Sequence, residues 1–213
     1  MSPTTVLSID TPRGKSEALL RASRELGRGQ VVVLPTDTTV AVAADAFSAV
    51  GRSRLAALKG WDQPVALQIL FSRPEALHAL AAEVTPLMTT LTEALWPGPL
   101  SIMTPVNPSL AGGLADFAPV VSLRIPDHDV LRELLADTGP LAVSGVQGVE
   151  MSSEAISLTL QATAPPGSRR STVIELDEEH ENGPVIRILR RGAVTKKTLQ
   201  DTVGRGAQVE IAD

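Results

Sequence analysis

The stretch VVVLPTDTTVAVAADAF, residues 31–47, joins an apolar run to a turn rich in hydroxyl groups. The run Val31 to Leu34 is dominated by β-branched residues, which favours a buried strand. Pro35 interrupts it, and three threonines surround Asp37 before small apolar residues resume. Ligands of α/β proteins commonly bind where strands give way to loops, so we expect this turn to border a binding site.

Strands and helices are expected to alternate along the rest of the chain. Apolar or β-branched runs predict strands at 31–34, 65–71, 100–106, 120–125, 140–146, 171–176 and 185–189. Helical spacing and capping residues predict helices at 15–27, 48–60, 72–84, 86–95, 127–139, about 153–161, and one begun by Thr195. Several strands are apolar on both faces, so this alternation predicts an α/β fold with a mixed, largely buried β-sheet.

Length and composition predict one folded domain. The chain has 213 residues, of which 43% are hydrophobic and 20% charged, values typical of a globular protein. We expect a single domain over 1–213, with its core at about 12–204. No apolar run approaches the roughly 20 residues that a membrane helix needs, and the first residues lack the pattern of a secretory signal. A cytoplasmic protein with no membrane contact is therefore expected.

Several classes of active site are excluded by residues and motifs that the chain lacks. There are no cysteines, which rules out disulfides, thiolate catalysis and cysteine-ligated metals. The phosphate-binding patterns GxxxxGK[ST] and GxGxxG are missing, as are GxSxG and HExxH. A net charge of −5 and only 2% aromatic residues oppose a broad grip on nucleic acid.

The remaining candidates for chemistry are hydroxyl groups and cations near predicted strand and helix ends. They are Thr36, Thr38, Thr39, Lys59, Ser101, Arg124, Ser144, Arg190 and Arg191. If these side chains converge, they form an anion pocket, since arginine offers a planar fork for carboxylate or phosphate and lysine a compact charge. Each also has a purely structural interpretation: turn threonines can satisfy backbone groups, and Lys59 can complement a helix dipole.

Seven segments, taken in order, resemble the YrdC-like family, whose enzymes are threonylcarbamoyl-AMP synthases of tRNA modification. The segments are LPTDT (34–38) with ADAF (44–47), LKG (58–60) with Pro64 following, LWPGPLS (95–101), LRIPDH (123–128), GPLAVS (139–144), STVIEL (171–176) and ILRRGAV (188–194). This resemblance implies a single YrdC-like domain, a twisted mixed sheet flanked by helices with a concave ligand pocket.

The resemblance also implies a two-stage adenylation. The amine of L-threonine and bicarbonate form a carbamate, whose oxygen attacks the α-phosphate of ATP and expels pyrophosphate, a reaction that depends on positioning and charge neutralisation. Mg²⁺ would be held by the triphosphate more than by the protein, so no protein metal ligand is expected. The implied site residues are Lys59 and Arg124 for negative charge in the reaction; Thr36, Thr38, Ser101, Ser144 and Gln147 for substrate; and Lys59, Ser171 and Arg190 for the nucleotide.

The chain departs from the family pattern at two of the pocket motifs. Where the family reads PTDTVYGLGADA, this chain has Val40 for the aromatic residue and Ala41 and Ala43 for two glycines. Since glycine alone tolerates a positive φ freely, we expect a more restricted loop there. After the lysine the family carries KGRP, whereas this chain places Trp61 and Asp62, an apolar ring beside a negative charge.

Two further motifs differ near the chain's second half. Where the family has Ser-Ala-Asn, this chain has Gly145, Val146 and Gln147, although Ser144 lies one residue earlier. The family's RPG becomes RRG, which keeps Arg190 and adds Arg191.

Three hypotheses about function therefore stay open. The first is a working threonylcarbamoyl-AMP synthase with altered ligand contacts. The second is a paralogue that keeps the fold and pocket but serves as a nucleotide or small-anion binder, or as a protein-interaction module. The third is recognition of tRNA or double-stranded RNA by a basic rim, which the acidic net charge disfavours.

Overall fold

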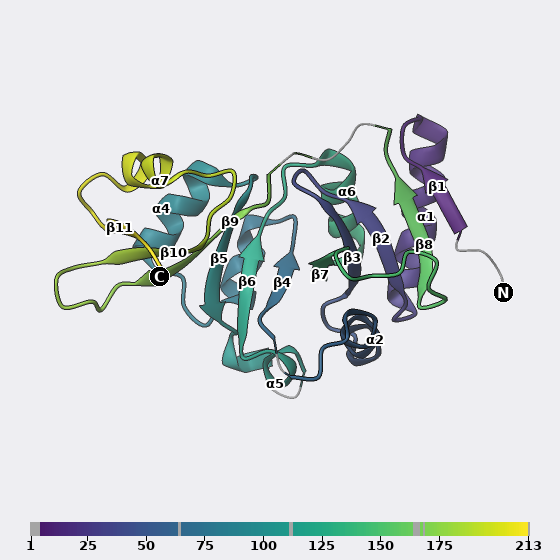
Figure 1. Cartoon of the computed structure of the whole chain (residues 1–213), viewed down its shortest axis with the longest axis horizontal. Coiled ribbons are helices and arrows are strands. Elements are labelled where there is room, and N and C mark those ends of the chain that lie inside the picture. Colours follow the sequence, from purple (N-terminus) through teal and green to yellow (C-terminus); the bar gives the residue numbers. More distant parts are fainter. Residues whose placement is uncertain (1–4, 64, 111–112, 164–166, 168, 213) are drawn as a thin grey trace.

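One mixed β-sheet of eleven strands organises the molecule (Figure 1). The computed structural model describes residues 5–63, 65–110, 113–163, 167 and 169–212. The strands are β1 (Thr5–Ser8), β2 (Val31–Pro35), β3 (Val40–Asp45), β4 (Leu67–Leu70), β5 (Leu100–Pro105), β6 (Val120–Arg124), β7 (Leu141–Gly145), β8 (Ile156–Gln161), β9 (Thr172–Asp177), β10 (Val185–Arg190) and β11 (Gln208–Ile211). The α-helices are α1 (Pro12–Gly27), α2 (Ala49–Lys59), α3 (Leu77–Leu80), α4 (Pro86–Leu95), α5 (Leu114–Phe117), α6 (Asp129–Thr138) and α7 (Lys196–Val203), with short 3₁₀ turns η1 (Pro74–Ala76) and η2 (Pro108–Leu110).

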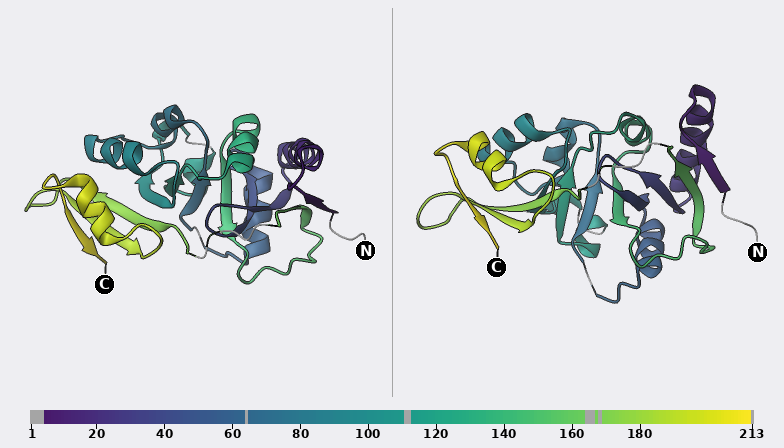
Figure 2. Two further views of the ribbon diagram at one scale, coloured as in Figure 1. Left: turned by 90° about the horizontal axis from the view of Figure 1, so that it is seen from above. Right: turned by 45° about the horizontal axis from the view of Figure 1, so that its top comes forward.

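The strands lie in the order β1-β8-β2-β3-β7-β4-β6-β5-β9-β10-β11. Five neighbouring pairs are parallel, among them β2–β8 and β4–β6, and the others are antiparallel, among them β2–β3 and β4–β7. Strand β1 forms one edge and β11 the other, at opposite ends of the molecule (Figure 2). This mixed α/β sheet confirms the predicted fold class.

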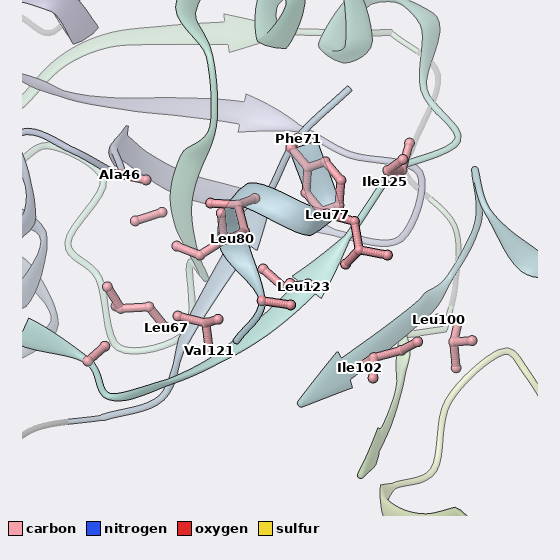
Figure 3. Close-up of a cluster of buried hydrophobic side chains, with 14 of the residues drawn as sticks. Ala46, Leu67, Phe71, Leu77, Leu80, Leu100, Ile102, Val121, Leu123 and Ile125 are labelled. Atoms are coloured by element: carbon pink, nitrogen blue, oxygen red, sulfur yellow. The ribbon is translucent and has the colours of Figure 1, made fainter. Parts of the chain in front are cut away.

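Each face of the sheet has its own apolar layer, because successive side chains of a strand point to opposite faces. Val31 and Val33 pack into a large cluster that includes Leu55 of α2, part of which is drawn in Figure 3. Val32 and Leu34 join a second cluster with buried residues of α1 and α6. Both faces of β2 are therefore buried, as its apolar sequence predicts.

Most predicted elements are confirmed, and several of their ends have the expected caps, but the helix predicted at 127–139 is capped by His128 rather than by Asp127. Helix α4 has the predicted bounds, and the hydroxyls of Ser48 and Thr195 accept backbone hydrogen bonds at the starts of α2 and α7. No helix in the described ranges has the length and apolar character needed to cross a bilayer. Pro64, part of one family motif, lies outside the described residues.

The helix predicted at about 153–161 is wrong, because residues 156–161 form strand β8. Ile156, Leu158 and Leu160 are buried while the residues between them are partly exposed. This is the alternation of a strand rather than helical spacing. Partners on both sides, β1 and β2, fix β8 inside the sheet.

Other differences concern short elements. The helix predicted at 72–84 consists only of η1 and α3. Strands β1, β3 and β11 were not predicted. Strand β11 lies in an acidic segment near the end of the sequence, where no strand was expected. Each gains its stability from pairing with a distant segment or a hairpin partner, which short propensity runs do not reveal.

Gly192 allows two parts of the chain to approach closely after β10. A Cβ atom built there would lie 2.4 Å from the carbonyl oxygen of Arg170 and from backbone atoms of Ser171 and Thr172. Real Cβ contacts are not that short, so any larger residue would push the start of β9 away from the end of β10.

Replacing Gly192 with alanine (Gly192→Ala) should therefore lower the free energy of unfolding by roughly 1–3 kcal/mol, the usual cost of overpacking. Gly27→Ala is the matched control, because nothing lies within 4 Å of a Cβ at the end of α1. Alanine is the better helix former there, so stability should stay unchanged or rise by up to about 1 kcal/mol. Urea denaturation of both variants measures the difference; equal stabilities would contradict the close-approach argument.

Candidate anion-binding site

A polar cavity of about 210 Å³ lies where several strands and one helix end. The turn between β2 and β3, the end of α2, the strands β4 and β7, and the segments around the start of β9 and end of β10 contribute to it. Its lining residues are Thr38, Thr39, Lys59, Gln68, Ser144, Gly145, Gln147, Arg170, Ser171 and Arg190.

Thr36 holds the shape of the β2–β3 turn. Its hydroxyl donates to the carbonyl oxygen of Thr39 (2.6 Å) and accepts from the backbone N–H groups of Thr38 (3.1 Å) and Thr39 (3.0 Å). This is the hydroxyl-stabilised turn that the sequence allows as a structural interpretation. Thr36 is 4% exposed and lies behind Thr38 rather than on the cavity wall.

Arg124, at the end of β6, supports the same turn from within the protein. Its guanidinium donates to the carbonyl oxygen of Gly98 (2.8 Å) and the hydroxyl of Thr38 (3.0 Å), and pairs with the carboxylate of Asp37. Only 2% of Arg124 is exposed. Burial lowers its pKa, an effect that the Asp37 charge opposes. The buried ion pair therefore fixes the Thr38 hydroxyl at the cavity edge.

A chain of hydrogen bonds links Gln68, Ser101, Ser171 and Arg190. The Gln68 amide donates to the Ser101 hydroxyl (3.0 Å), which donates to the Ser171 hydroxyl (3.1 Å). Arg190 also donates to the Ser171 hydroxyl (2.9 Å). A hydroxyl has two acceptor positions and one proton, so both acceptor positions of Ser171 are filled. Its own proton is left to donate to a ligand.

Lys59 reaches across from the end of α2 to the loop after β7. Its ammonium donates to the carbonyl oxygens of Gly145 (2.8 Å) and Gln147 (2.6 Å), and no residue in the described ranges accepts from its third N–H. Burial lowers the pKa of Lys59. A Cβ at Gly145 would lie 2.4 Å from the side-chain oxygen of Gln147, so these two residues fit each other.

The cavity carries positive charge. Lys59, Arg170 and Arg190 line it, and none of the lining residues in the described ranges is an aspartate or glutamate. Burial lowers the pKa of Arg190, and the nearby charges of Arg170 and Arg124 lower it further. Like charges gathered in a partly buried site favour a bound anion that offsets their repulsion.

The predicted residues converge in this one region. Seven of them line the cavity, and Arg191 does not; the seven are Thr38, Thr39, Lys59, Ser144, Gln147, Ser171 and Arg190. Thr36, Ser101 and Arg124 lie behind it, each hydrogen-bonded to a lining residue. Their ligand contacts stay predictions.

Three residues of the site were missed in the sequence. Gln68 is the single polar residue in the apolar run VALQILF, and this break in the pattern could have identified it as a site residue. Arg170 lies two residues before the start of β9, in a loop without a recognisable motif. The partnership of Asp37 with Arg124 joins residues 87 positions apart, which no local pattern indicates.

The altered family positions have less effect on this cavity than expected. Ala41 and Ala43 lie in strand β3, and no residue other than glycine has a positive φ in the described ranges, so the predicted restricted loop is wrong. Trp61 packs against the apolar core and does not line the cavity. In place of an arginine after Lys59, the cavity receives its further positive charge from Arg170 and Arg190.

No group of three or more His, Asp or Glu side chains in the described ranges is arranged to hold a metal ion. The cavity offers cationic and neutral groups rather than carboxylates. A divalent cation at this site would consequently depend on oxygens supplied by an anionic ligand.

The fold matches that of solved structures. The P. abyssi Sua5 structure complexed with L-threonine superposes with a TM-score of 0.81 at 21% identity, over 97% of this chain and 62% of that one. The chain thus spans less than two thirds of that Sua5 protein. E. coli YciO superposes with a TM-score of 0.74 at 18% identity, over 93% of this chain and all of that one.

Sequence comparison gives the family. A Mycobacterium leprae protein provisionally named threonylcarbamoyl-AMP synthase is 30% identical over 211 residues, covering 93% of this chain and 94% of its own. Residues 24–192 match the model of the Sua5/YciO/YrdC family, which is described as telomere recombination. Since that match covers most of the chain, the protein belongs to the Sua5/YciO/YrdC family, as its sequence motifs predict.

Proposed function

We propose that this protein forms L-threonylcarbamoyladenylate from L-threonine, bicarbonate and ATP. The observation that carries the proposal is the convergence of Lys59, Arg170 and Arg190 with the Thr38 and Ser171 hydroxyls around one polar cavity. The Mycobacterium leprae relative that carries the name threonylcarbamoyl-AMP synthase aligns with 93% of this chain. The P. abyssi Sua5 structure complexed with L-threonine shares its fold. The single continuous sheet supports treating 1–213 as one domain, with its core at about 12–204.

The proposed reaction has two steps. The amine of threonine forms a C–N bond with the carbon of bicarbonate, losing water and giving a carbamate. A carbamate oxygen then attacks the α-phosphorus of ATP, and the bond to the β-phosphate oxygen breaks to release pyrophosphate. Negative charge is concentrated on the phosphates throughout, so catalysis depends on positioning and on cations placed in advance.

The cavity's residues suit those tasks. Arg190, Arg170 and the free N–H of Lys59 would neutralise phosphate or carbamate oxygens, and the Ser171 hydroxyl would donate a hydrogen bond to one of them. Thr38, held by Arg124, would orient the threonine-derived group together with Ser144 and Gln147, which line the same cavity.

The whole nucleotide would extend beyond this cavity. Its volume of about 210 Å³ is below that of typical pockets for drug-sized ligands. A neighbouring cavity of about 350 Å³ shares Thr38 with it and includes Asp127 and Arg169. Mg²⁺ would enter as part of the triphosphate substrate, coordinated by phosphate oxygens and water.

A second candidate function is anion or nucleotide binding without turnover. Two contacts favour it: the carbonyls of Gly145 and Gln147 hold two of the three N–H groups of Lys59, so the ammonium stays bound to this loop and offers an anion only its remaining N–H. Recognition of tRNA or double-stranded RNA, and a protein-interaction role, stay predictions that these contacts do not test.

Arg190→Ala should lower kcat/KM for pyrophosphate release by about 10²–10³-fold, the usual effect of removing one donor to a developing anion. Arg191→Ala is the matched control, because Arg191 is the adjacent residue with the same charge and does not line the cavity. Its activity should stay within about twofold. Pyrophosphate is measured with threonine, bicarbonate and MgATP; equal losses in both variants would refute the role given to Arg190.

Thermal unfolding with ligands separates the two functions. ATP should raise the melting temperature of the native protein, since a ligand bound only by the folded state stabilises it, and Lys59→Met should reduce that rise. If ATP stabilises the protein but ATP with threonine and bicarbonate yields no pyrophosphate at high enzyme concentration, the second candidate function, binding without turnover, is correct. If ATP gives neither stabilisation nor product, both candidates are refuted.

A further inference from the structure

A second cavity, of about 630 Å³, lies apart from the polar site. It is formed by η1, α3, α4, the turn after α4, the end of β6 and α6. Its volume is within the range of about 300–1,000 Å³ found for small-molecule sites. None of its lining residues borders the polar cavity.

The walls of this cavity are mainly apolar and well supported. Leu77, Trp96 and Ile125 contribute large apolar surfaces. The Trp96 indole N–H donates to the carbonyl oxygen of Leu100 (2.7 Å), and the ring packs edge-on against Phe71 with centroids 5.6 Å apart. A ring held at two sides loses little freedom on contact with a ligand, which favours binding.

The charges that line the cavity do not balance. Glu75 and Glu93 are exposed and line it, and neither forms an ion pair with a basic side chain in the described part of the chain. Arg132 is the one arginine or lysine of the lining; one of its terminal nitrogens pairs with Asp129 (2.5 Å), and its Nε has no partner in the described ranges. The excess charge is therefore negative.

We propose that this cavity binds a small amphipathic amine. An aliphatic or aromatic body would contact Trp96, Leu77 and Ile125, and its ammonium would lie at the mouth beside Glu75 and Glu93. Burial of the apolar body supplies most of the affinity, and the two carboxylates select the cation over a neutral or anionic analogue. This assignment is independent of the function proposed for the polar cavity.

Three eight-carbon probes that differ only in their head group test the selection: octylamine, octanol and octanoate. In the Trp61→Phe variant, Trp96 is the only tryptophan, so its fluorescence reports directly on the cavity wall. Octylamine is expected to change this fluorescence saturably, with octanol weaker and octanoate weakest. Saturation by octanoate at lower concentration than octylamine, or no saturable change with octylamine, would overturn the proposal.

Variants then locate the binding. The double variant Glu75→Gln with Glu93→Gln should weaken octylamine binding about three- to tenfold, as expected for two exposed charge pairs, and leave octanol unchanged. Glu17→Gln with Glu154→Gln is the matched control: it removes the same charge from exposed positions outside the cavity. An equal loss in the control would show a general charge effect and overturn the assignment.

Filling the cavity gives an independent test. Thr92 lines it from α4, and Thr92→Phe would place a ring in the space of the ligand body. All three probes should then bind at least tenfold more weakly, provided that the melting temperature shows a folded protein. Unchanged binding in folded Thr92→Phe would overturn the proposal, and the glutamate variants decide the matter should this variant not fold.

Discussion

The buried ion pair between Arg124 and Asp37 is the interaction on which the site depends. An arginine that is 2% exposed must satisfy its guanidinium within the protein, since an unpaired charge there would cost several kcal/mol. Its partners come from the β2–β3 turn and from the turn after α4, segments that are distant in sequence. By satisfying one charge, the protein fixes two turns and gives Thr38 its position. The polar cavity is built outward from that fixed point.

The hydrogen-bond chain through Ser101 and Ser171 works in a similar way beside β5, β9 and β10. The Ser171 hydroxyl accepts from both Ser101 and Arg190, so toward the cavity it has its own O–H to donate. This donor, with Lys59, Arg170 and Arg190 in the same lining, is complementary to carboxylate, carbamate and phosphate oxygens. The chemical character of the site thus follows from how its buried partners are satisfied.

Sequence patterns predicted the parts of the structure that are encoded locally. The strand at Val31, the caps at Ser48 and Thr195, and the hydroxyl and cationic side chains at element ends could all be found from nearby residues. What could not be found depends on distant pairing. Strand β8 is held by β1 and β2, and the role of Asp37 depends on Arg124. The two alanines of β3 would restrict the backbone of a loop but suit a strand. Only the pairing of β3 with β2 shows that they lie in a strand.

The fit between Gly145 and Gln147 has a consequence for how such a site changes during evolution. The side-chain oxygen of Gln147 occupies the space that a Cβ at position 145 would need, while both residues offer their carbonyl oxygens to Lys59. Because that oxygen is the far end of a flexible side chain, a serine at 145 would make the glutamine side chain turn aside without moving the backbone. A change at 145 therefore repositions the Gln147 side chain in the cavity, while the two backbone carbonyls continue to hold Lys59.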